Sequence, residues 1–143
     1  MKAILLLILL MGILACAGCT SATTAPLVTT GIPSLTGNWT GTVKGYGEGT
    51  GYFESNSGSL DLRITEQKDR LFSGQLFITE SNGSVSTRQF AGALCHDGKS
   101  FTLVQFDSGY DLGTVLSDNE IEMVYMNDKK PAFLVIDSFT RAP

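Results

Sequence analysis

The sequence predicts an all-β domain, an antiparallel up-and-down meander of eight or nine strands that closes into a β-barrel. Three observations support this prediction. From Leu35 onward apolar and polar residues alternate with a period of two, which is typical of half-buried strands. Short polar turns separate the alternating segments, so sequential strands should pair antiparallel. No stretch of ten residues after position 34 carries the 3.6-residue period of a helix. A two-sheet β-sandwich is the alternative architecture.

The expected strands follow one another along most of the chain after the first 37 residues. The pattern is clear at Leu60, Leu62 and Ile64, which alternate with polar residues and should face a core. A meander of this length can close on itself and so remove its exposed edges. The nine predicted segments are 38–44, 50–54, 59–66, 70–80, 84–94, 100–106, 109–116, 120–126 and 132–141.

Further along, Tyr110, Leu112 and Leu116 form a second apolar row, which predicts that these side chains also face the core. The strongest turn signals are Asn82-Gly83 and Asp97-Gly98. Both dipeptides favour two-residue hairpin loops, because glycine and asparagine or aspartate tolerate the positive φ that such turns require.

The N-terminus has the features of a secretory signal. Lys2 precedes an apolar run over residues 3–14, and small residues follow it. The run is shorter than the roughly 20 residues that span a bilayer. Ala-Gly before Cys19 resembles a bacterial-type lipobox, which implies that this cysteine is lipidated and becomes the new N-terminus. Cys16 is the alternative acceptor, and ordinary cleavage a few residues later is the alternative to lipidation.

These features divide the chain into three parts: a signal peptide over 1–18, a lipidated N-terminus and flexible tether over 19–34, and a β-barrel domain over 35–143. Removal of the signal leaves 9 basic and 14 acidic residues, a formal charge of −5. This charge argues against a nucleic-acid partner. With Cys19 lipidated, Cys95 has no disulfide partner, and we expect it to be a small buried residue.

The start of the first strand resembles a known motif. Gly37 and Trp39 form a Gly-x-Trp sequence similar to the first-strand motif of the calycin barrels, the lipocalins and avidins. That resemblance implies that Trp39 closes one end of a barrel and that a basic residue of the last strand, here Arg141, packs over the indole. A guanidinium over an indole face is a favourable cation–π arrangement. The resemblance implies no biotin or lipid site.

The wider chain resembles small uncharacterised lipoproteins of methanogenic archaea. The segments that carry this resemblance are 37–42, 49–52, 64–74, 90–93 and 97–99. It implies a cell-surface location and leaves the function unassigned.

Residues suited to catalysis or metal binding are few. His96 is the sole histidine, and its neighbours Cys95 and Asp97 would point away from it along a strand. We therefore expect no catalytic residue, no metal site and no cofactor. Four acidic residues could form carboxylate pairs, but we expect them to be solvated. They are Glu48, Glu54, Asp107 and Asp111.

Ligand contacts are expected around the glycine-rich segment 45–51. Tyr46, Tyr52 and Phe53 flank it and could line or gate the mouth of a barrel, or simply cover the core. Two Asn-x-Ser/Thr sequons, at Asn82 and Asn38, are candidate glycosylation sites.

The expected function is that of a non-catalytic binding module, anchored by lipid to the outer face of the cell membrane. Its ligand would be small and apolar, or a glycan, or its partner would be an envelope protein. The alternatives are a structural or interaction lipoprotein of the envelope without a ligand pocket and, for location, a secreted protein.

Overall fold

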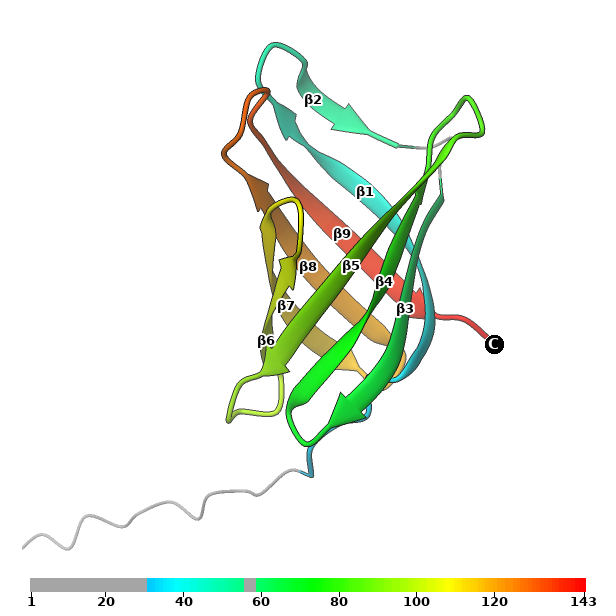
Figure 1. The fold of residues 1–143 in the computed structure, drawn as a ribbon, viewed down its shortest axis with the longest axis vertical. Helices are drawn as coiled ribbons and strands as arrows, with labels where there is room; N and C mark the ends of the chain where they lie inside the picture. The colour runs from blue at the N-terminus through cyan, green and yellow to red at the C-terminus, as the bar shows by residue number, and fades with distance from the viewer. Residues whose placement is uncertain (1–30, 56–58) are drawn as a thin grey trace, which may run out of the picture.

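The computed structural model describes residues 31–55 and 59–143, and within them the chain forms nine strands (Figure 1). The predicted signal peptide, both candidate lipidation sites and most of the tether lie outside the described residues. The strands are β1 (Gly37–Gly47), β2 (Gly51–Glu54), β3 (Ser59–Lys68), β4 (Leu71–Thr79), β5 (Val85–Leu94), β6 (Ser100–Gln105), β7 (Tyr110–Ser117), β8 (Glu120–Asn127) and β9 (Phe133–Arg141). All nine predicted strands are present.

The sheet closes into a barrel. Every pairing is antiparallel, and consecutive strands from β3 to β9 are neighbours. β1 then pairs with β9 over most of its length, from Trp39 opposite Arg141 to Gly47 opposite Phe133. Eight strands thus form a closed antiparallel barrel with β2 as an extra strand, which settles the architecture against the sandwich.

β1 changes partners halfway along. Its first part, from Gly37 to Gly41, pairs with β3, whereas Lys44 to Gly47 pair with β2. For this reason the first strand extends three residues beyond the predicted 38–44 segment. The segment expected as a loose glycine loop is consequently strand at both ends, and only residues 48–50 form the turn. β2 stands at one end of the barrel, at the top of Figure 1.

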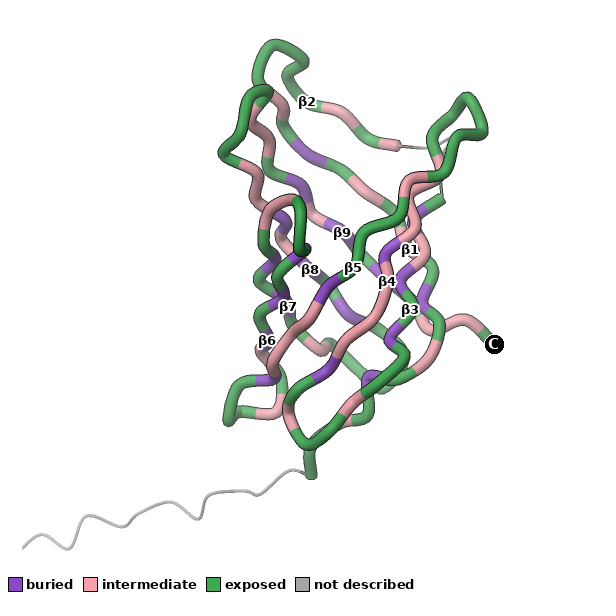
Figure 2. The backbone as a smooth tube through the Cα atoms, viewed as in Figure 1, coloured by how far each residue is buried: buried purple, intermediate pink, exposed green. Residues whose placement is uncertain are grey.

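The apolar core fills the other end of the barrel. Its largest members include Trp39, Phe90 and Phe139, each no more than 2% exposed. Inward-facing glycines make room for aromatic rings. Gly113 lies directly opposite Phe101, and a Cβ at this glycine would collide with the ring. Packing is therefore dense at this end. Figure 2 shows buried residues alternating with exposed ones along the strands, whereas the turns are largely exposed.

β7 turns inward the face that the sequence analysis assigned to the outside. Tyr110, Leu112 and Leu116 were expected to point inward, but each is more than half exposed. Asp111 and Gly113 are buried instead. Because side chains alternate across a strand, a single register choice moves the whole apolar row to the outside. The pairing of β7 with β6 and β8 imposes this choice.

Cys95 also differs from its expected environment. It follows β5 at the start of a turn and is exposed, with no disulfide partner among the described residues. Its backbone N–H donates to the Ser100 carbonyl and its carbonyl accepts from the Gly98 N–H. The backbone of Cys95 therefore stabilises the turn between β5 and β6, and its side chain is left exposed.

Candidate functional site

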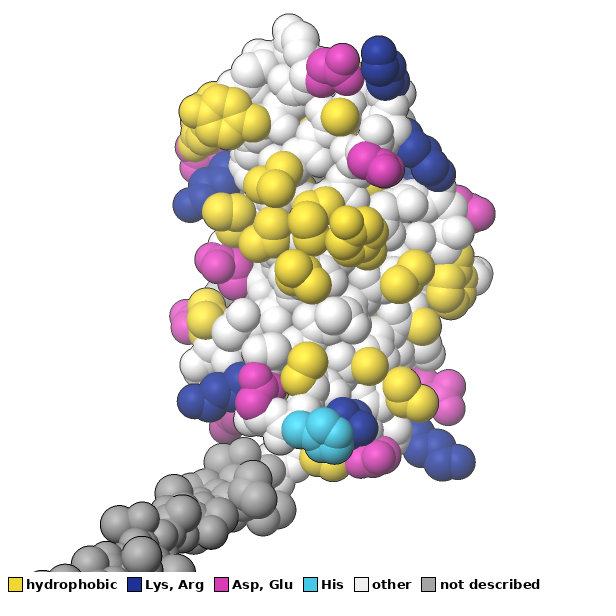
Figure 3. Space-filling model, turned by 90° about the vertical axis from the view of Figure 1, so that its left-hand side faces the viewer, with side chains coloured by type: hydrophobic (Ala, Val, Ile, Leu, Met, Phe, Trp, Pro, Cys, Tyr) yellow, Lys and Arg dark blue, Asp and Glu magenta, His cyan; other side chains and the backbone are white. Residues whose placement is uncertain are grey.

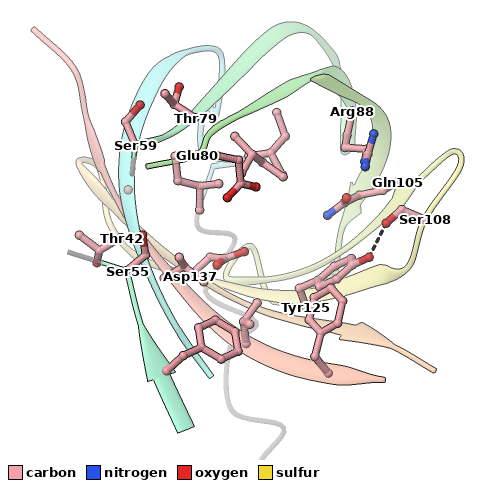
Figure 4. Close-up of a pocket in the computed structure, with 18 residues that line it drawn as sticks. Thr42, Ser55, Ser59, Thr79, Glu80, Arg88, Gln105, Ser108, Tyr125 and Asp137 are labelled. Carbon is pink, nitrogen blue, oxygen red and sulfur yellow. Dashed lines mark hydrogen bonds between the residues drawn. The ribbon is translucent and has the colours of Figure 1, made fainter. Parts of the chain in front are cut away.

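A cavity of about 360 Å³ occupies the end of the barrel where β2 lies (Figure 4). We call this space the cup. It forms because the core stops short of this end and because β1 diverges from β3 there. The cup has an apolar wall and a set of polar groups directed into it. Its lining residues are Gly41, Thr42, Val43, Phe53, Ser55, Ser59, Leu60, Leu76, Ile78, Thr79, Glu80, Arg88, Gln105, Ser108, Tyr125, Phe133, Val135 and Asp137.

Two buried carboxyl groups lie at the inner end of the cup. Asp137 of β9 lines it and is 4% exposed, and Asp111 of β7 is fully buried behind Gln105. The Gln105 side-chain amide donates to Asp111 Oδ2 at 3.1 Å. The Oδ1 atoms of both aspartates have no hydrogen-bond partner. Such orphaned buried acceptors are rare in folded proteins, because each costs free energy that a partner would recover.

Burial changes the protonation of this pair. Desolvation raises the pKa of Asp111 from 3.8 to about 6, although the hydrogen bond from Gln105 opposes it. Desolvation, together with the negative charge of Asp111, raises the pKa of Asp137 from 3.8 to about 7. No cation contributes to either shift. Near neutral pH the pair therefore changes its charge within the physiological range.

The wall next to β9 is ordered by a tyrosine of β8. The Tyr125 hydroxyl hydrogen-bonds the Ser108 hydroxyl and accepts the Gly109 backbone N–H at 3.0 Å. This contact joins β8 to the turn between β6 and β7. Tyr125 is 6% exposed, so its ring forms part of the buried wall. The polar end of this ring is satisfied by the turn.

The three ligand contacts expected from the sequence are not brought together. Phe53 lines the cup. Tyr46 and Tyr52, by contrast, are 66% and 55% exposed and pack edge to face on the outer surface, with ring centroids 5.5 Å apart. They lie directly opposite each other on β1 and β2. The adjacent pair, Gly45 opposite Phe53, is on the inward-facing side of the two strands. Alternation along these strands explains why only one of the three aromatics points inward.

The residues expected to close the barrel lie at the other end. The Arg141 guanidinium stands 4.1 Å from the centroid of the Trp39 ring. Its nitrogens donate to the backbone carbonyls of Thr36 at 2.6 Å, Ser34 at 2.9 Å and Asp118 at 3.0 Å. The chain preceding β1 is thereby held across this end of the barrel.

Two further contacts complete the closed end. The Trp39 indole N–H donates to the Leu35 carbonyl at 3.0 Å, and Leu35 itself is 1% exposed. Gly37 has a φ of 131°, and a Cβ there would come within 3.0 Å of an Arg141 nitrogen. Glycine is therefore suited to this position by both conformation and space. The described chain begins at this end, opposite the cup.

The two sequons lie on the surface. Asn82 is exposed in the β4–β5 turn, where its side chain accepts the Ser84 backbone N–H at 2.8 Å. Gly83 after it has a φ of 83°, but Asn82 does not have a positive φ, and residues 80–84 separate the paired Thr79 and Val85, so the predicted two-residue hairpin loop is wrong. Asn38 is exposed within β1 and accepts a hydrogen bond from Arg63 at 3.1 Å.

Sequence reasoning missed the polar floor of the cup. Asp111 was expected to be solvated and is instead fully buried, whereas Asp137 was not singled out. A signal was present: Asp137 lies two residues from both Val135 and Phe139, so strand alternation places it on the buried face. The residues just before it, 133–136, are all apolar, so the alternation of buried and exposed positions was hard to recognise.

The outer surface carries a band of apolar side chains, which we call the outer belt. It crosses neighbouring strands through directly opposed residues and is visible in Figure 3 over part of the barrel. A continuous exposed apolar surface of this kind is unusual on a protein without partners. Its members with exposure above 45% are Val104, Tyr110, Leu112, Leu134, Tyr46 and Tyr52.

The described residues form neither a metal-binding cluster nor a membrane-spanning helix. Residues 31–55 and 59–143 contain no group of three or more His, Cys, Asp or Glu side chains that could hold a metal ion. Within the same ranges, no helix is long and apolar enough to cross a bilayer.

No model of a protein family matches this sequence, and no curated protein matches it. Several solved structures are similar. A redesigned β-barrel has a TM-score of 0.59 at 11% identity, with 76% of this chain and 92% of that chain covered. The structure of EF1p2_mFAP2b bound to DFHBI has a TM-score of 0.55 at 12% identity, covering 76% and 94%. A fluorescence-activating β-barrel designed de novo has a TM-score of 0.50 at 12% identity, covering 75% and 93%. These similarities establish the barrel fold alone.

Proposed function

We propose that this protein is a non-catalytic binding module that holds a small molecule in the cup. The observation that carries the proposal is the division of the barrel interior: one end is filled by core side chains, and the other contains a cavity of about 360 Å³. That volume lies in the range of small-molecule sites. An apolar wall with a few convergent polar groups is the usual composition of such a site.

Similar barrels support the proposal in one respect. EF1p2_mFAP2b was solved bound to DFHBI, so a barrel of this general shape can hold a small molecule. The chemical class of ligand that this chain binds depends on its own lining residues.

Filling the cup is expected to abolish binding. Ile78 of β4 lines the cavity, so Ile78→Trp should place an indole where a ligand would lie. The neutral aromatic 1-naphthylmethanol is a suitable probe, followed by NMR shifts of the backbone amides. We expect wild-type shifts to concentrate around the cup and the variant to lose affinity at least tenfold.

Leu71→Trp is the matched control for this variant. Leu71 lies on the same strand but is 65% exposed, so its replacement should leave the probe affinity within twofold. Shifts confined to the outer belt, unchanged by Ile78→Trp, would contradict a ligand site in the cup.

A second candidate is an interaction role in the cell envelope, and the outer belt favours it. Its opposed apolar residues, such as Val104 and Tyr110, offer a partner a surface that burial would stabilise. A photo-crosslinking residue at position 112 should then give one discrete adduct with an envelope protein in intact cells. The same residue at position 65, an exposed polar site, should give none.

We further propose that the protein is attached by lipid on Cys19 to the outer face of the cell membrane, as in the archaeal lipoproteins it resembles. The described chain begins at the closed end, where Ser34 and Thr36 contact Arg141. A lipid upstream of these residues would attach the domain through the end opposite the cup. The cup would then stay free of the attachment point, in agreement with a module that takes its ligand from outside.

Cys19→Ser is expected to shift the protein from the membrane fraction to the soluble fraction, or to leave it as uncleaved precursor. The barrel should fold in either case, because its strands lie beyond residue 36. Fractionation with intact mass measurement distinguishes these outcomes. A variant that is cleaved and still membrane-bound would exclude lipid on Cys19 as the anchor.

A further inference from the structure

The polar floor of the cup lacks a positive charge. Asp137 lines the cavity with its Oδ1 atom unpartnered, and the unpartnered Oδ1 of Asp111 lies buried behind it. Glu80 adds a third carboxylate nearer the opening, and Figure 4 shows its side chain directed into the cup. Acidic groups thus face the cavity from β9 and from the residue after β4, and Asp111 of β7 is buried close to them.

The cations among the described residues do not neutralise the two buried aspartates. Arg88 is the cation that lines the cup, but its side chain is exposed and makes no hydrogen bond with either aspartate. Desolvation is the largest unfavourable influence on the charge of both aspartates, the charge of Asp111 adds to it at Asp137, and no cation contributes favourably. A buried acidic pair of this kind is costly unless a positive group compensates it.

The surroundings suit an organic cation better than a metal ion. Calcium requires six to eight oxygen ligands, and the described residues contain no cluster that could hold a metal. Aromatic rings are present instead. Phe53, Phe133 and Tyr125 line the cup, and aromatic faces attract cationic groups as well as apolar surface. The volume also exceeds what a single ion fills.

We propose that the cup binds a small organic cation, with an ammonium or amidinium group against Asp137 and an apolar body among Phe53, Phe133 and the aliphatic wall. Asp111 supports the site by its negative charge and by fixing Gln105 through the 3.1 Å hydrogen bond. The proposal rests on the function proposed above, because it names the chemical class of ligand for the same cavity. Its distinguishing requirement is positive charge.

Two probes of nearly equal size separate charge from shape: 1-naphthylmethylamine, which is cationic at pH 8, and neutral 1-naphthylmethanol. Calorimetric titration of the purified protein should show the amine binding at least tenfold more tightly than the alcohol. Asp137→Asn should weaken the amine at least tenfold and change the alcohol less than twofold. Glu122→Gln, which removes an exposed carboxylate from the outer face of β8, should alter neither affinity.

Each other outcome is decisive. Equal wild-type affinities for the two probes would refute the cationic ligand and leave the proposed function intact. Binding of neither probe to the wild type would count against both. Displacement of the amine by calcium chloride, at an ionic strength where sodium chloride does not displace it, would assign the carboxylates to a metal ion and overturn the proposal.

Discussion

Asp137→Asn is expected to stabilise the ligand-free protein at pH 8 by about 2 kcal/mol in its free energy of unfolding. The wild type buries a carboxylate whose pKa is raised from 3.8 to about 7 by desolvation and by the charge of Asp111. Ionising this group in the folded state is therefore unfavourable at high pH. An amide removes the charge while keeping the shape.

The sign of the pH dependence follows from the same values. The folded protein retains protons on Asp111 and Asp137 up to pH values of about 6 and 7, whereas the unfolded chain loses them near 3.8. Folding thus binds protons in this interval. The free energy of unfolding should fall as pH rises from about 4 to 8, by on the order of 6 kcal/mol. The contribution is fully present below pH 4 and lost above pH 7.

Urea denaturation at several pH values checks this prediction, with Trp39 fluorescence or circular dichroism as the signal. Asp137→Asn should flatten the profile, and the double variant with Asp111→Asn should flatten it further. Glu122→Gln provides the matched control, because its carboxylate is exposed and its profile should follow the wild type. Parallel profiles for wild type and Asp137→Asn would show that Asp137 does not titrate as an isolated buried acid.

The second large effect is expected at the closed end. Trp39→Ala should lower the free energy of unfolding by about 4 kcal/mol, because Trp39 is 1% exposed and lies within the core. The variant also loses the hydrogen bond to the Leu35 carbonyl and the ring beneath the Arg141 guanidinium. A midpoint decrease of about 15 °C should accompany it, measured by circular dichroism because the sole tryptophan is gone.

Tyr46→Ala is the matched control on the same strand. Its ring is 66% exposed, so the change should stay within about 0.5 kcal/mol of wild type. A double-mutant cycle between Trp39→Phe and Arg141→Met would measure the coupling of the stacked pair, expected at about 1 kcal/mol. A Trp39→Ala variant as stable as the wild type would mean that the closed end contributes little to folding.

Trp39 at the closed end stabilises the fold, whereas the ionised Asp137 in the cup destabilises it. This contrast agrees with the proposed function. The closed end is packed and hydrogen-bonded, whereas the cup contains a destabilising acidic pair. Proteins often accept such local cost at a site where a ligand later compensates it. A bound cation beside Asp137 would recover the free energy that burial of the carboxylates requires.

Much of the fold could be predicted from local sequence. Strand existence follows from the period of two, and turn positions from residues such as Gly83 and Gly98, both with positive φ. Closure of the sheet into a barrel was predicted from the number of strands. The stacked Trp39 and Arg141 were foreseen through a resemblance, because neither residue by itself indicates its partner at the far end of the chain.

The cup was harder to predict, for a physical reason. A carboxylate on a strand is normally solvated, so Asp111 and Asp137 were either assigned to the surface or not singled out. Their burial depends on the face that each strand turns inward, and that choice belongs to the register of the whole barrel. β7 shows this plainly, since its apolar row faces solvent while Asp111 faces the interior.

The sequence by itself determined the all-β class and the order and approximate bounds of the strands. These properties depend on alternation and turn chemistry, which are local. Only the tertiary structure decided that the barrel is filled at one end and hollow at the other, and that two aspartates lie together at the floor of the hollow. Those features depend on register and closure, because cavity-lining residues from β1, β8 and β9 meet there only once β1 pairs with β9.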